Sequence, residues 1–220
     1  MSQPLDLKAL ERKAFRSTFQ DGLWDLYFGC LLLVNTFMFT FLENEQMPWL
    51  IPTLAFVLLA GSAGLFWLGK KYITAPRLGH VKFGPERRKK GLTLGLILAG
   101  FVLFTLALVL ITAAGGRSPA VRAAVDAWLP EVRTPSLLLA SFLGLFLGSV
   151  IAVIAFFNDF PRGYYIAVVT SLGFFLTYLL DTPVYLGIAA LLVIVPGLVL
   201  FARFLRDHPL PPAEAINEQS

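Results

Sequence analysis

The chain has 220 residues, of which 57% are hydrophobic and only 15% are charged. This is more apolar surface than one soluble core of that length can bury, so the composition predicts a membrane protein. Long uninterrupted runs of Leu, Ile, Val and Phe favour helices in lipid, because strands of an outer-membrane barrel alternate over short segments. The net charge of +4 does not indicate nucleic-acid binding, since the basic residues flank apolar runs and line no soluble face.

Residues 1–20 precede the first apolar run and are predicted to form a basic amphipathic helix on the inner membrane surface. Over 5–19, apolar side chains recur on one side of the predicted helix. The other side carries four basic residues: Lys8, Arg12, Lys13 and Arg16. We find no small-residue cleavage site of the secretory kind, so this segment is expected to be retained.

Six stretches reach the roughly 17 to 20 apolar residues that a bilayer core requires. They are approximately 22–42, 49–69, 91–112, 136–157, 164–180 and 184–205. The sequence therefore predicts an all-α polytopic bundle, with a transmembrane domain over residues 21–207. The connections between the first two spans and between the last two are very short, which predicts antiparallel hairpins.

Asp21 and Asp25 lie four residues apart at the inner end of the first span, so they share one helical face. Residues 26–42 are long enough to span the bilayer alone, which allows both acids to lie at headgroup level. In this interpretation they pair with one of three arginines: Arg16, Arg77 or Arg162. The alternative is a proton or cation site open to the cytoplasm, because a charge deep in lipid is costly and usually functional.

Asn35 is the deepest strongly polar residue of the first span, where an amide most often bonds to a neighbouring helix. Pro196 lies in the inner half of the sixth span and is expected to kink that helix. Interrupted helices occur at transporter binding sites. Asp21, Asp25, Asn35 and Pro196 are therefore the residues expected along a polar path, if the protein is a carrier.

The segment 70–90 is predicted to be a basic inner loop, with eight basic residues against one acid. The eight are Lys70, Lys71, Arg77, Lys82, Arg87, Arg88, Lys89 and Lys90. Near an anionic leaflet each contributes about 1 kcal/mol, enough together to dock the loop on lipid headgroups or an acidic partner. The simpler interpretation is that these charges only set the topology.

Two pairs of glycines have the Gly-x-x-x-Gly spacing that lets helix backbones approach closely in lipid. They are Gly91 with Gly95 in the third span and Gly144 with Gly148 in the fourth. Packing within the bundle is the expected role, and a homodimer face is the alternative. The outer loop 113–135 is predicted to contain a surface helix after Ser118, and the polar, Pro-rich tail 208–220 to be disordered.

The positive-inside rule orients the bundle. With the amino terminus inside, the inner side carries 15 Lys and Arg and the outer side carries 3. This asymmetry predicts a multi-pass protein of the plasma (inner) membrane, with both termini in the cytoplasm.

No catalytic motif or metal-ligand cluster stands out in the sequence, and the middle of every span lacks ionisable residues. Proton-coupled and ion-coupled carriers usually place such residues there. We therefore expect a non-catalytic membrane subunit or accessory protein without a cofactor, which engages anionic lipid, a protein partner or a second copy of itself. A carrier or channel for a small or lipid-like solute is the alternative.

Overall fold

The computed structural model describes residues 15–41, 50–78, 84–117 and 137–209, and these ranges are almost entirely helical, without strands. Six helices are long and apolar enough to cross a membrane. They are α2 (Leu23–Phe41), α3 (Leu50–Gly69), α5 (Pro85–Arg117), α7 (Leu137–Phe157), α8 (Pro161–Leu180) and α9 (Val184–Asp207). The predicted all-α transmembrane bundle is confirmed.

The predicted inner loop 70–90 is wrong at both of its ends, because the chain stays helical there. α3 continues through a π-helix, Lys70–Thr74, into the short helix α4 (Ala75–Leu78). The π turn ends two residues before Pro76, which has no N–H for a regular helical hydrogen bond. α5 begins at Pro85 and runs for 33 residues, about 50 Å at 1.5 Å per residue, so its basic first turns extend beyond a bilayer core.

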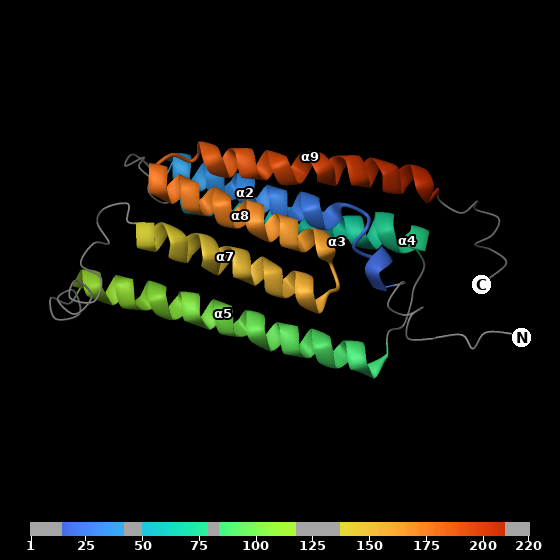
Figure 1. The fold of residues 1–220 in the computed structure, drawn as a ribbon, viewed down its shortest axis with the longest axis horizontal. Helices are drawn as coiled ribbons and strands as arrows, with labels where there is room; N and C mark the ends of the chain where they lie inside the picture. The colour runs from blue at the N-terminus through green and yellow to red at the C-terminus, as the bar shows by residue number, and fades with distance from the viewer. Residues whose placement is uncertain (1–14, 42–49, 79–83, 118–136, 210–220) are drawn as a thin grey trace, which may run out of the picture.

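The helices form a layered bundle in which α2 and α8 are central (Figure 1). α2 packs against α9, α3 and α8, and α8 also packs against α7 and α9. α5 lies at the periphery and contacts α7, for example where the rings of Phe101 and Phe104 lie 5.3 and 5.6 Å from that of Phe146. No residue between Arg87 and Ala107 is buried in the chain. Most of the α5 surface is thus left to lipid or to a partner.

A tight turn joins α7 to α8 and has the hydrogen bonds of a Schellman motif. The amide of Phe160 donates to the carbonyl of Ala155, and the amide of Asp159 donates to that of Phe156. Asp159 has a φ of 51°, in the left-handed region that Asp tolerates better than most residues. Pro161 then starts α8. This turn holds Asp159 at the end of the bundle where α2, α5 and α8 begin.

That same end carries nearly all the described basic residues, and we call it the basic end. It comprises the turn Phe15–Gln20, the π-helix with α4, the first turn of α5, the α7–α8 turn and the last turns of α9. Several predicted features lie outside the described residues. They are Lys82, most of the amino-terminal helix, the outer surface helix and nearly all of the tail.

Candidate functional site

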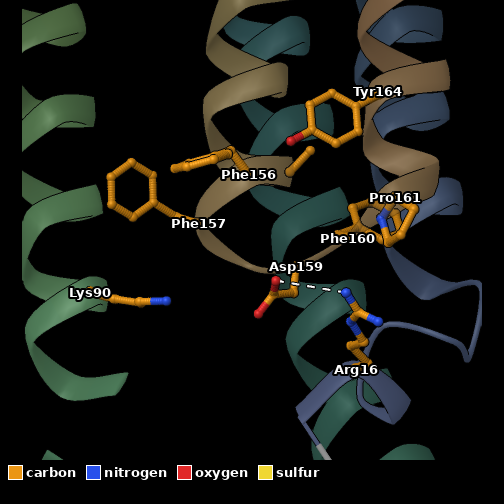
Figure 2. A pocket seen from close by; sticks show the side chains of 9 residues that line it. Arg16, Lys90, Phe156, Phe157, Asp159, Phe160, Pro161 and Tyr164 are labelled. Carbon is orange, nitrogen blue, oxygen red and sulfur yellow. Dashed lines mark ion pairs between the residues drawn. The ribbon is translucent and has the colours of Figure 1, made fainter. Parts of the chain in front are cut away.

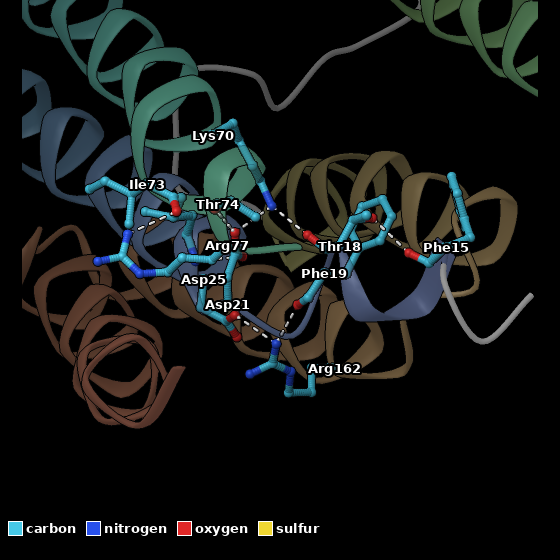
Figure 3. Close-up of polar contacts among 11 residues, drawn as sticks. Phe15, Thr18, Phe19, Asp21, Asp25, Lys70, Ile73, Thr74, Arg77 and Arg162 are labelled. Atoms are coloured by element: carbon cyan, nitrogen blue, oxygen red, sulfur yellow. Dashed lines mark hydrogen bonds and ion pairs between the residues drawn. The ribbon is translucent and has the colours of Figure 1, made fainter. Parts of the chain in front are cut away.

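Asp21 is the centre of a buried polar cluster at the basic end (Figure 3). The side chain of Asp21 has 0% exposure. Its carboxylate accepts a hydrogen bond from Thr74 Oγ1 at 2.6 Å and one from the Leu23 amide at 3.2 Å. Lys70 Nζ lies 2.7 Å from Asp21 Oδ2. Every oxygen of this carboxylate is therefore occupied by donors from α2 and the π-helix.

The π-helix brings Lys70 and Thr74 to the same carboxylate. Lys70 also donates to the carbonyl of Thr18, and its ammonium lies 5.8 Å from the ring centroids of both Phe19 and Phe66. One ammonium thus joins the Phe15–Gln20 turn, the start of α2 and the end of α3. Its role is to hold these segments together, because its hydrogen bonds point into the protein.

Asp25 is one turn further along α2 and is nearly fully buried. Arg162 of α8 reaches it, with 3.4 Å between Nη2 and Oδ2. The same Nη2 donates to the carbonyl of Phe19 at 2.6 Å. Asp21, Asp25, Lys70 and Arg162 together carry two negative and two positive charges, so the cluster is neutral.

The predicted pairing of these acids with arginines holds only in part. Arg162 pairs with Asp25, but Asp21 pairs with Lys70. Arg77 donates to the carbonyl of Ile73 in its own helix, and Arg16 lies 3.9 Å from Asp159. The Lys70 pairing depends on the π turn, which the sequence does not indicate beyond the position of Pro76.

Asn35 and Pro196 are the other residues of the predicted polar path, and each lies beside a polar group that has a hydrogen-bond partner in the structure. The Asn35 amide donates to the carbonyl of Leu31 in its own helix. Pro196 leaves the carbonyl of Leu192 without its helical donor, and Tyr165 Oη of α8 donates to that carbonyl at 3.0 Å. Both polar groups are therefore satisfied at their places in α2 and α9.

Glycines bring α9 close to α2 at this end of the bundle. A Cβ on Gly22, whose φ is +77°, would lie 2.5 Å from the Gly197 carbonyl oxygen. A Cβ on Gly29 would lie 2.3 Å from Ile194, and one on Gly197 would lie 2.9 Å from the Asp25 Cβ. Backbones can approach this closely only where side chains are absent. Sequence reasoning missed these positions because they do not share one four-residue spacing.

The two predicted glycine pairs differ from each other. Gly144 and Gly148 of α7 face α8, where a Cβ would lie 2.6 Å from the carbonyl oxygen and the hydroxyl of Ser171, respectively. For Gly91 and Gly95 of α5, a Cβ would meet nothing within 4 Å. Packing within the bundle is therefore wrong for Gly91 and Gly95, because no described helix covers that part of α5.

The basic residues predicted to bind lipid or a partner separate into two groups. Lys70 and Arg87 are used inside the protein: Arg87 Nη1 lies 3.2 Å from Asp159 Oδ2, and its guanidinium lies 4.0 Å from the Phe15 ring centroid. The exposed group comprises Lys71, Arg88, Lys89 and Lys90. Lys71 lies over the rings of Trp67 and Tyr72, an arrangement typical of a membrane interface.

A recess of about 500 Å³ lies at the basic end between α5 and the α7–α8 turn (Figure 2). Arg16 and Lys90 approach it from two sides around Asp159. The rest of its lining is mostly aromatic: Ala155, Phe156, Phe157, Phe160, Pro161 and Tyr164. Sequence reasoning did not anticipate this recess, because the stretch 155–164 forms its walls together with Arg16 and Lys90, which lie far away in the chain.

Within the described residues, no three His, Cys, Asp or Glu side chains gather closely enough to hold a metal ion. Comparison of the chain with protein-family models, with curated proteins and with solved structures finds no match. The geometry of the basic end is therefore the basis for any functional proposal.

Proposed function

We propose that this protein is a non-catalytic membrane subunit or accessory protein, whose basic end faces the cytoplasm and engages anionic lipid or an acidic partner. The supporting observation is the division of the basic residues at this end. Lys70, Arg87 and Arg162 neutralise buried or half-buried acids. Arg88, Lys89 and Lys90 are exposed on the first turns of α5, with no ion pair to any described residue.

Their position on the helix favours a binding role. Arg88, Lys89 and Lys90 directly precede the apolar part of α5, which begins at Gly91. Cations at this level lie beside lipid phosphates, where each contributes about 1 kcal/mol. Because α5 packs loosely on the bundle, a partner could also reach this basic turn and the open face beyond it.

The close approach of α2 and α9 favours this proposal over the carrier. A carrier needs a polar route between helices near the middle of the bilayer. Ile194 fills the space beside Gly29, and the Asn35 amide is hydrogen-bonded within its own helix. The recess described above lies at the basic end instead.

Native mass spectrometry of gently extracted protein tests the proposal. We expect the wild-type chain to retain anionic phospholipid or a stoichiometric partner, and the Arg88→Glu, Lys89→Glu double variant to lose it. Arg203→Glu with Arg206→Glu is the matched control, because it makes the same charge change on exposed residues of α9 at the same end. A wild-type chain that carries neither lipid nor partner, or equal retention by both variants, contradicts the proposal.

The orientation is tested separately. Reporter tags fused to the two ends of the chain should both respond to a reagent confined to the cytoplasmic side. Tags that report opposite sides of the membrane, or two external ends, would contradict the cytoplasmic placement of the basic end.

A further inference from the structure

The recess at the basic end combines charge and aromatic surface in a defined order (Figure 2). Lys90 and Arg16 lie with Asp159 at the level where α5 and α8 begin, whereas Phe156, Phe157 and Tyr164 lie further along the helices, away from the basic end. Lys90 is the last charged residue before the apolar stretch of α5. The recess is therefore at the boundary between headgroups and hydrocarbon.

The charges around the recess leave a positive surplus. Asp159 is the only acid among the described residues that line it, and its closest described cation is Arg87 at 3.2 Å, which does not line the recess. Arg16 is more distant at 3.9 Å, and its side chain is 44% exposed. Lys90 is exposed and has no ion pair to a described residue. Lys90 is thus available to an anion that enters, and Arg16, which shares Asp159 with the closer Arg87, can turn toward that anion as well.

The start of α8 adds to this surplus. Pro161, the first residue of the 20-residue helix α8, lines the recess. The amino-terminal end of a helix carries a partial positive charge that attracts anions. The aromatic walls point to a ligand that also has an apolar part, because a small hydrated anion gains nothing from Phe156 and Phe157.

We propose that this recess binds an anionic glycerophospholipid, with its phosphate between Arg16 and Lys90 and its acyl chains against Phe156 and Phe157. Basic pockets between transmembrane helices recognise such headgroups, and a volume of about 500 Å³ lies within the usual range of ligand sites. The inference rests on the proposed function, since it names one lipid site within the basic end.

Lipid titration followed by native mass spectrometry tests the site, with phosphatidylglycerol and phosphatidylcholine as probes. We expect Arg16→Gln with Lys90→Gln to weaken binding of the first phosphatidylglycerol about 30-fold, since two phosphate contacts are lost. The matched control, Arg203→Gln with Arg206→Gln, removes two exposed charges of α9 from the same end without touching the recess. Because neither of these charges contacts the recess, the first binding step of this variant should change less than about 3-fold.

A second variant separates charge from folding. Arg16→Lys with Lys90→Arg keeps both charges and should bind as the wild type does, and thermal unfolding of all variants shows whether the bundle is intact. Equal weakening by both Gln variants overturns the recess but leaves the proposed function, because binding would then be spread over the basic end. Equal affinity of the wild type for the two lipids overturns the recess and the lipid form of the proposed function, and leaves only the acidic partner. Displacement of phosphatidylglycerol by millimolar inorganic phosphate overturns the assignment to lipid.

Discussion

The contact of α7 with α8 and the open face of α5 contain the same Gly-x-x-x-Gly spacing and use it differently. Gly144 and Gly148 let Ser171 of α8 approach, and the Ser171 hydroxyl donates to the Gly144 carbonyl at 2.6 Å. A Cβ on Gly91 or Gly95 would have no described atom of another helix within 4 Å. The spacing permits close packing, but whether packing occurs depends on which helix the topology places opposite.

A similar contrast exists among the charges of the basic end. Asp21 is buried and hydrogen-bonded to the half-buried Lys70, whereas Arg88 and Lys89 are exposed on α5. The first group is expected to hold the fold together, and the second is available for binding. Substitutions within each group should therefore separate stability from interaction.

The largest effect is expected at Asp21. Asp21→Ala removes the partner of the Lys70 ammonium and of Thr74, and loss of one member of a buried pair costs about 3–5 kcal/mol. The free energy of unfolding, measured by denaturant titration in mixed micelles, should fall by that amount. Asp207→Ala is the control, since Asp207 forms an exposed pair with its neighbour Arg206, and no measurable loss is expected there. A loss of less than 1 kcal/mol for Asp21→Ala, on the scale of an exposed pair, would show that the cluster is not structural.

The glycine comparison should give the next largest effect. Gly148→Ala places a Cβ 2.6 Å from the Ser171 hydroxyl and 2.9 Å from the Ala167 carbonyl oxygen, and overpacking of this kind costs about 1–3 kcal/mol. Gly95→Ala meets no atom within 4 Å and should leave stability unchanged or raise it by up to about 1 kcal/mol through helix propensity. The same unfolding assay compares them. If Gly95→Ala proves as damaging as Gly148→Ala, α5 packs against a second copy or a partner.

Arg87 and Arg88 are neighbours with opposite environments, so they sharpen the comparison of charges. Arg87→Ala removes the pairing with Asp159 and the contact with the Phe15 ring, which should lower stability by about 1–3 kcal/mol. Its side chain is only 13% exposed. Arg88→Ala should change stability by less than about 0.5 kcal/mol. Equal losses of stability for the two variants would show that Arg87 contributes no more to the fold than the exposed Arg88 does.

The smallest effect is expected where α8 meets the kinked part of α9. Tyr165→Phe removes the donor to the Leu192 carbonyl, and hydrogen bonds between membrane helices contribute about 0.6 kcal/mol on average. In a Pro196→Ala background the Leu192 carbonyl regains its helical donor, so Tyr165→Phe should then leave the free energy of unfolding unchanged. A double-mutant cycle measures the difference. Additive effects would mean that the hydroxyl does not substitute for the donor that Pro196 lacks.

Much of the fold follows directly from the sequence. The described parts of α2, α3 and α7 fall within the predicted spans 22–42, 49–69 and 136–157, because apolar length must match the thickness of the bilayer. The start of α5 was placed six residues too late, at Gly91 instead of Pro85. Hydropathy marks where a helix enters lipid, whereas helix propensity continues through Arg and Lys in water.

The candidate site was much less accessible to prediction. Arg162 was one of three arginines predicted to pair with the two acids, and it pairs with Asp25. Lys70 was assigned to the inner loop, because a run of cations gives no sign of which member turns inward. The walls of the recess come from the Phe15–Gln20 turn, α5, α7 and α8. No local pattern reports such a juxtaposition.

The sequence by itself determined that lipid surrounds this protein and how many helices cross the membrane. The reason is that the hydrophobic effect and the backbone's need for internal hydrogen bonds act on each helix separately. It also separated the basic end from the opposite side, which carries only 3 of the 18 Lys and Arg residues. Only the tertiary structure decided which charges neutralise one another, which glycines are covered and where a recess forms. Those outcomes depend on distances between side chains from different helices, which local sequence does not encode.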